Sequence, residues 1–282
     1  MVEAAEIELV QATQVARQAA VRQSANGVCY AFYGALTVDE KEVEAIVQAV
    51  PLAIAGALKQ KAYYFVPLTI GDGDPPAGGE GGAPAGGEQD TPAGEGFHDA
   101  GETLVAAAYS VELSDRAICH RNVVFGGSDC VFLSTRLMPD KFALAFEFFI
   151  NVARAFVDAA GVPESFGDLA WSQALADVRG DTGQDAWESR RKALGREPGS
   201  SERTQPARID EKAKTAFFDS AFADAVAIYL LSLTVDFDYA DLREREYPLL
   251  AAPSLADRLR LVAGLFPPNA GYEFSILYRR KS

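Results

Sequence analysis

The chain is poor in the residues that most often carry metal, redox or acid–base chemistry, and it lacks the common catalytic signatures. Its 282 residues include two His, three Cys and two Met. No GxGxxG, P-loop, GxSxG, HExxH or paired CxxC motif occurs, so the usual nucleotide, hydrolase and zinc sites are not indicated. Three cysteines without close pairing are typical of a reducing compartment.

Positive charge is also scarce. The chain has 26 Lys and Arg against 40 Asp and Glu, which gives a net charge of −14. Seven of the acids lie in residues 71–101, which contain no Lys or Arg, so the rest of the chain carries −7. Nucleic acid and anionic membrane surfaces are therefore poor partners on electrostatic grounds.

Uninterrupted hydrophobic runs are missing as well. The most apolar stretches, 142–157 and 217–235, contain charged residues, which argues against a membrane span. The N-terminal MVEAAEIELVQATQ has acids where a signal peptide would need bases. We expect a protein of the cytoplasm with no membrane partner.

Glycine and proline are concentrated in one segment, 71–101, with eleven Gly and four Pro. We predict that it is a disordered acidic insertion; a tether that docks on a basic partner is the alternative. The segment GREPGSSERTQPAR, 195–208, has the composition of a flexible linker. We predict that residues 1–282 form a single domain that contains this insertion and this linker.

Periodicity predicts an α+β fold. It is expected to have one mainly antiparallel sheet of about six strands, from the first half plus a C-terminal strand, packed with helices, and a largely helical C-terminal half. The predicted strands are 28–36, 62–70, 103–113, 117–125, 130–136 and 272–278. The predicted helices include 3–23, 38–50, 140–160, 165–178, 183–194, 210–235 and 254–265.

Two tight turns, Ser114–Asp115 and Gly126–Gly127, set the expected strand register. His120 then lies between Tyr109 and Leu133, and Asn122 lies beside Val131, on an apolar face. The helix 140–160 is the expected cover for that face, because it follows the last strand directly. Most of its circumference is apolar, and its polar residues fall within a wedge of roughly 60°.

This register predicts a candidate site. The catalytic residues would be His120 as general base, Glu147 to orient the imidazole and Arg154 to hold an anionic group of the substrate. Asn122, Asn151 and Tyr109 would contact the substrate. The alternative is a core histidine with its hydrogen bonds satisfied and a helix-surface stripe closed by an Arg154–Asp158 pair.

A metal site is not expected. The spacing His98-x3-Glu102 suggests one, with His120 or Cys119 as a third ligand, but the register places Glu102 about 23 Å from His120. Cys119 and Cys130 should be about 13 Å apart and remain separate thiols. We expect no cofactor.

Two further charged features have open interpretations. Asp224 is nearly alone on an apolar helix, so it is either a buried acid or a residue at the helix edge. The run Arg190–Arg191–Lys192 is interpreted as a solvated helix end.

Three functions are compatible with these observations. The first is binding of an unknown small molecule or protein. The second is a cofactor-independent enzyme that uses His120. The third is a homo-oligomeric structural protein, since the helix 210–235 is apolar around most of its circumference and could bury one side in a second copy.

Overall fold

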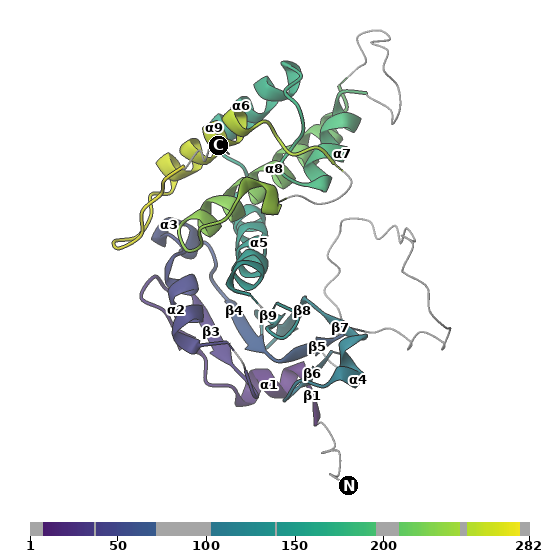
Figure 1. Cartoon of the computed structure of the whole chain (residues 1–282), viewed down its shortest axis with the longest axis vertical. Coiled ribbons are helices and arrows are strands. Elements are labelled where there is room, and N and C mark those ends of the chain that lie inside the picture. Colours follow the sequence, from purple (N-terminus) through teal and green to yellow (C-terminus); the bar gives the residue numbers. More distant parts are fainter. Residues whose placement is uncertain are drawn as a thin grey trace, which may run out of the picture. The chain divides into compact units, whose positions relative to one another are not determined.

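The computed structural model describes residues 8–36, 38–71, 103–138, 140–195, 209–242 and 247–276, which fall into two compact units. The sheet unit comprises Met1–Gln23, Cys29–Asp39 and Gln60–Pro139. The helical unit comprises Ser24–Val28, Glu40–Lys59 and Asp140–Ser282. The α+β class is confirmed, with most strands in the first half of the chain and most helices in the second (Figure 1). The assignment of residues 1–282 to one domain stays a prediction.

The sheet unit holds two sheets, so the expectation of one six-stranded antiparallel sheet is wrong. The four-stranded sheet has the order β1-β6-β5-β7, and the five-stranded sheet has the order β2-β3-β4-β9-β8. The strands are β1 Leu9–Gln11, β2 Arg22–Gln23, β3 Cys29–Phe32, β4 Lys61–Val66, β5 Leu68–Ile70, β6 Leu104–Ala106, β7 Ala117–Ile118, β8 His120–Phe125 and β9 Ser128–Ser134.

The centre of the five-stranded sheet is parallel. Strand β3 pairs with β4, and β4 pairs with β9, each in parallel. Parallel neighbours need a long connection, and the chain between β3 and β4 runs through two helices, α2 Glu40–Gln48 and α3 Leu52–Ala55. A helix between two predicted strands was therefore the signal for a parallel pair.

The predicted strand 62–70 is two strands in different sheets. Pro67 separates β4 from β5, and a proline cannot donate to a ladder. The predicted strand 117–125 is divided in the same way, at Cys119 between β7 and β8. Ser134 of β9 links the two sheets, because its hydroxyl accepts a hydrogen bond from the N–H of Thr69 at 2.7 Å and donates to the carbonyl of Ile118.

The register of the second hairpin is confirmed. Across the Gly126–Gly127 turn, His120 lies opposite Leu133, Asn122 opposite Val131 and Val123 opposite Cys130. Both glycines have positive φ, 60° and 80°, as a tight turn of this kind requires.

The first predicted hairpin is wrong. Only Leu104–Ala106 of the segment 103–113 is a strand, and it pairs with β1 and β5 rather than with 117–125. Ser110 then caps a short helix, α4 Val111–Ser114, by accepting from the N–H of Glu112. Tyr109 is consequently not opposite His120.

The N-terminal helix is shorter than expected. The predicted segment 3–23 contains β1, then α1 Ala12–Gln18, then β2, because Leu9–Gln11 is taken up by pairing with β6. Val10 and Val15 join Tyr64, Val123 and Phe132 in one apolar core of the sheet unit.

The helical unit is built around one long helix. Helix α8, Glu211–Ser232, packs against α5, α7 and α9 (Figure 1). The other helices are α5 Lys141–Ala160, α6 Glu164–Leu175, α7 Gln184–Ala193, α9 Ala252–Leu265 and the 3-10 helix η1 Tyr239–Leu242. By length and composition, α8 alone among the described helices could cross a membrane, but 61% of its most apolar window is buried within the protein.

Helix α5 begins and ends as the sequence predicts. The carboxylate of Asp140 accepts from the N–H of Ala143 at 2.7 Å, and Gly161, with φ 71°, ends the helix. Among the described residues no strand follows Pro268, so the predicted strand is wrong over 272–276, and 277–278 lie outside the described residues. The predicted insertion and linker also lie outside them, apart from Gly71 and Gly195.

Candidate ligand pocket

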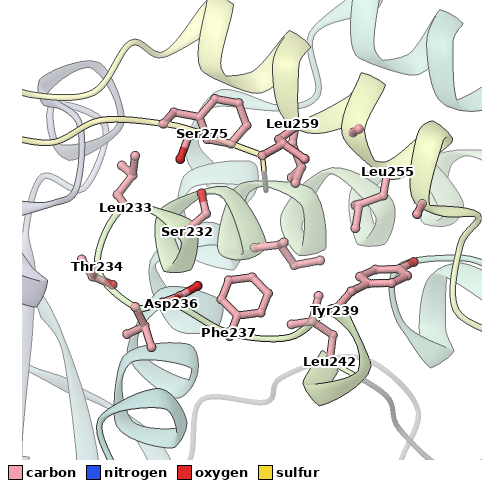
Figure 2. Close-up of a pocket in the computed structure, with 16 residues that line it drawn as sticks. Ser232, Leu233, Thr234, Asp236, Phe237, Tyr239, Leu242, Leu255, Leu259 and Ser275 are labelled. Atoms are coloured by element: carbon pink, nitrogen blue, oxygen red, sulfur yellow. The ribbon is translucent and has the colours of Figure 1, made fainter. Parts of the chain in front are cut away.

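The helical unit contains a cavity of about 390 Å³ at the C-terminal end of α8. Its walls come from α8, the segment that follows it, η1, α9 and the extended residues 274–276 (Figure 2). The lining residues are Ile228, Ser232, Leu233, Thr234, Val235, Asp236, Phe237, Tyr239, Leu242, Ala252, Leu255, Ala256, Leu259, Phe274, Ser275 and Ile276. We refer to this cavity as the ligand pocket.

The α9 wall follows directly from the spacing of its apolar residues. Positions 252, 256 and 259, together with 255, lie on one face of an α-helix, and here they are Ala, Ala, Leu and Leu. The two alanines leave room between the helices, while Leu255 and Leu259 enclose the cavity. The face is thus apolar but incompletely filled.

Three polar side chains of the pocket lie away from Leu255. Figure 2 shows the oxygens of Asp236, Ser232 and Ser275 toward one end, and Leu255 and the hydroxyl of Tyr239 toward the other. The hydroxyl of Ser232 donates to the carbonyl of Tyr229 at 2.6 Å. The walls therefore suit a molecule with an apolar body and one polar end.

A buried ionic network lies behind the end of the pocket that carries Tyr239 and Leu255. Asp181 and Arg258 are fully buried, and Arg190 is 1% exposed. The carboxylate of Asp181 accepts from Nη1 of Arg258 at 2.8 Å and from Nη1 of Arg190 at 3.4 Å. Nε of Arg258 donates to the side-chain carbonyl of Gln173 at 2.8 Å. The network joins α6, α7 and α9 around the loop that carries Asp181.

Tyr239 connects this network to the pocket wall. Its hydroxyl donates to the carbonyl of Leu250, and the N–H of Leu250 donates to the carbonyl of Asp181 at 2.9 Å. Burial raises the pKa of Tyr239 to about 12, so it is a neutral hydrogen-bond donor. Gly180 permits the close approach of these segments, because a Cβ there would lie 2.1 Å from the carbonyl oxygen of Leu249.

This network corrects one expectation. Arg190 is not part of a solvated helix end, since its guanidinium also donates to the carbonyls of Gly180 and Val178, each at 2.7 Å. The sequence showed the charged residues but could not show that a carboxylate from the preceding loop reaches the helix.

Asp224 lies beside the ligand pocket, on a largely buried stretch of α8, and its own side chain is partly buried. Its carboxylate accepts from the hydroxyl of Thr182 at 3.0 Å and lines a smaller pocket of about 220 Å³. Burial, more than the nearby carboxylates of Asp181 and Asp185, raises its pKa to about 7. This second pocket, the Asp224 pocket, shares Ile228 and Leu242 with the ligand pocket.

The predicted site residues fall into two sets in different units. His120 and Asn122 project from β8 of the sheet unit and are each partly exposed, on a face where Val124 is 42% exposed. The buried face of β8 is the opposite one, through Val123. The expectation that His120 and Asn122 lie on the buried face is wrong. It depended on the first predicted hairpin, which does not form.

Glu147, Asn151 and Arg154 are on α5 of the helical unit. Asn151 is buried, and its amide donates to the carbonyl of Glu147 at 2.9 Å and weakly to its carboxylate at 3.4 Å. Arg154 is exposed and lines the Asp224 pocket. Tyr109 is 41% exposed, and the guanidinium of Arg136 lies 5.4 Å from its ring centre. The convergence of His120 with Glu147 and Arg154 stays a prediction.

Metal and disulfide chemistry have little support in the described part of the chain. It contains no group of three His, Cys, Asp or Glu side chains that could hold a metal ion, while His98 and Glu102 lie outside it. All three cysteines are free thiols, and Cys119 and Cys130 are separate, as expected.

The ligand pocket was not predicted from the sequence. The periodicity of α8 and α9 indicated their apolar faces, but the cavity is the space left where three separate stretches of chain, 228–242, 252–259 and 274–276, pack together. Comparison with protein-family models, curated proteins and solved structures gives no match for this chain.

Proposed function

We propose that the protein binds a small, mostly apolar molecule in the ligand pocket. The observation that carries this proposal is a cavity of about 390 Å³ whose walls are formed largely by leucine, isoleucine, alanine and aromatic side chains. Concave sites of this size, with mostly apolar walls and a few polar groups, are the usual form of small-molecule sites.

Alternative functions have less support. The homo-oligomer hypothesis was based on the apolar circumference of α8. Burial of α8 against helices of its own unit accounts for that circumference without a second copy. The enzyme hypothesis requires His120 and Arg154 to meet, and it stays a prediction. A cytoplasmic location is proposed on the three free cysteines and the acidic composition.

The test is calorimetric titration of the protein with 1-octanol, an uncharged apolar probe. We expect saturable binding that is lost when Leu255→Trp fills the cavity. Leu265→Trp is the matched control, because Leu265 is on the same helix, is 38% exposed and does not line the pocket. Binding that survives in the Leu255→Trp protein, or that never saturates in the wild type, would contradict the proposal.

A further inference from the structure

Three aromatic side chains line the ligand pocket, and they come from two separate stretches of the chain. Figure 2 shows the rings of Phe237 and Tyr239 on the segment that follows α8. Phe274 belongs to the extended residues 274–276. All three side chains are partly exposed, so part of each ring remains accessible. The pocket therefore presents aromatic surface from two of the stretches that form its walls.

The two phenylalanine rings are held in place by residues outside the pocket. The ring of Phe237 packs against the ring of Phe142 in α5, with 5.8 Å between the ring centres. The ring of Phe274 meets the ring of Tyr229 in α8 edge-on, with 5.3 Å between the centres. Neither Phe142 nor Tyr229 lines the cavity, so these contacts orient the two rings without filling it. Side chains that are already ordered lose little conformational entropy when a ligand binds.

The three lining rings do not pack on one another. In the part of the chain that the structure describes, no two of the rings of Phe237, Tyr239 and Phe274 are in contact. The ring of Tyr239 is fixed separately, because its hydroxyl donates to the carbonyl of Leu250. Aromatic rings prefer aromatic neighbours in offset or edge-to-face arrangements. The cavity beside these rings can therefore take a further ring as such a neighbour.

The cavity is also large enough for a guest of this kind. An apolar cavity of about 150 Å³ can hold one molecule of benzene. The ligand pocket has about 390 Å³, which leaves room for a second ring or a short polar chain. Leu255 and Leu259 of α9 complete the apolar wall.

We infer that the natural ligand is a small aromatic molecule whose ring contacts Phe237 and Phe274, with the rest of its apolar surface against Leu255 and Leu259. This inference rests on the proposed function and names the chemical class of the molecule. The guest ring makes edge-to-face or offset contacts with the two phenylalanines, and these contacts add to the gain from burying its apolar surface. A saturated ring of the same size gains from burial alone.

The experiment compares 2-phenylethanol with 2-cyclohexylethanol, two alcohols with the same carbon skeleton, by calorimetric titration of the wild type and of Phe237→Leu and Phe274→Leu. Each variant replaces a ring by another apolar side chain. We expect each to weaken the binding of 2-phenylethanol by about two- to tenfold more than that of 2-cyclohexylethanol. Each alcohol is compared with itself across the proteins, so the difference in hydrophobicity between the alcohols cancels.

The matched control is Phe218→Leu. Phe218 is a partly exposed phenylalanine of α8 that does not line the pocket, so its replacement should change the binding of neither alcohol. Binding of 2-cyclohexylethanol to the two pocket variants shows in the same experiment that their pocket is intact.

The outcomes separate the two proposals. If the pocket variants weaken both alcohols by the same factor, or if 2-phenylethanol does not bind while 1-octanol does, the aromatic class is overturned and the apolar pocket remains. If neither alcohol nor 1-octanol binds to the wild type, the proposed function fails and the inference fails with it. If Phe218→Leu weakens 2-phenylethanol as much as the pocket variants do, the ring is recognised elsewhere and this assignment of the site is wrong.

Discussion

Nη1 of Arg258 lies 2.8 Å from Oδ1 of Asp181, and both side chains are fully buried. A second guanidinium, that of Arg190, reaches the same carboxylate, so among the described residues two positive charges share one negative charge. Within the described part of the chain, Nη2 of Arg258 has no hydrogen-bond partner. Asp181 therefore takes part in both ion pairs, so its replacement affects both arginines at once.

We expect Asp181→Asn to lower the free energy of unfolding by about 3–5 kcal/mol, because it removes the carboxylate that pairs with two buried guanidinium groups. Arg258→Met should cost less, since the remaining Asp181–Arg190 pair is electrically balanced. Urea unfolding followed by circular dichroism measures both. Asp257→Asn is the control for an exposed ion pair with Arg260, worth about 0–1 kcal/mol. Equal losses for the Asp181 and Arg258 variants would contradict this account.

The stability of the protein should depend on pH through Asp224. The pKa of this carboxyl is about 7 in the folded protein, against an ordinary value of 3.8, so the folded state holds a proton that the unfolded state releases. The stabilisation is complete below pH 3.8 and is lost as pH rises through 7. Thr182, Asp181, Asp185 and Arg154 are the groups that act on this carboxyl.

The matched variant is Asp224→Asn, which keeps a side-chain oxygen for Thr182. At pH 8 it should be more stable than the wild type by about 2–4 kcal/mol, and the difference should shrink toward pH 5. Thermal and urea unfolding across this range give the comparison, with the exposed Asp257→Asn as a control that shows no such trend. A difference that is the same at pH 5 and pH 8 would show that Asp224 is not the titrating group.

Gly183 should be intolerant of even one methyl group. A Cβ at this position would lie 2.5 Å from Oδ2 of Asp224, inside the contact distance of any two such atoms. Gly183→Ala is expected to destabilise the protein by about 1–3 kcal/mol, as overpacking typically does. Gly264→Ala is the control, because nothing lies within 4 Å of its Cβ and alanine favours the α9 helix by about 0.5–1 kcal/mol. The two variants should shift the melting temperature in opposite directions.

Affinity in the ligand pocket should grow with alkyl chain length. Each methylene buried against Leu255 and Leu259 contributes about 0.8 kcal/mol, so affinity should rise about fourfold per carbon in the series from hexanol to octanol. The increase should stop once the cavity of about 390 Å³ is filled. Calorimetry of the series gives the slope, and a slope near zero would indicate that the probes bind outside the apolar walls.

Local patterns were sufficient wherever one short segment determines the geometry. The Gly126–Gly127 turn placed His120 opposite Leu133 correctly, and the helix predicted over 140–160 agrees with α5, which has its N-cap at Asp140 and its C-cap at Gly161. In each case the residues that determine the structure are neighbours in the chain. Turn chemistry and helix capping depend only on such neighbours.

Errors arose where distant segments compete for the same residues. Leu104–Ala106 pairs with Leu9–Gln11, and this pairing shortens the N-terminal helix and takes the place of the first predicted hairpin. The sequence around Arg190 indicates a solvent-exposed helix end, but in the structure its guanidinium pairs with the carboxylate of Asp181, which lies nine residues earlier. The ligand pocket depends on the packing of α8, η1 and α9, and no property of any one of these segments predicts its volume.

The chain passes from the five-stranded sheet to the four-stranded sheet at Pro67, between β4 and β5. The hydroxyl of Ser134 in β9 adds a hydrogen bond to Thr69 of β5 near the same point. Opening of either sheet would therefore strain the peptide that joins β4 to β5, and with it the other sheet. Backbone amides of β4 and β5 should therefore exchange with deuterium in one concerted opening event, and the whole first unit should melt as a single cooperative block.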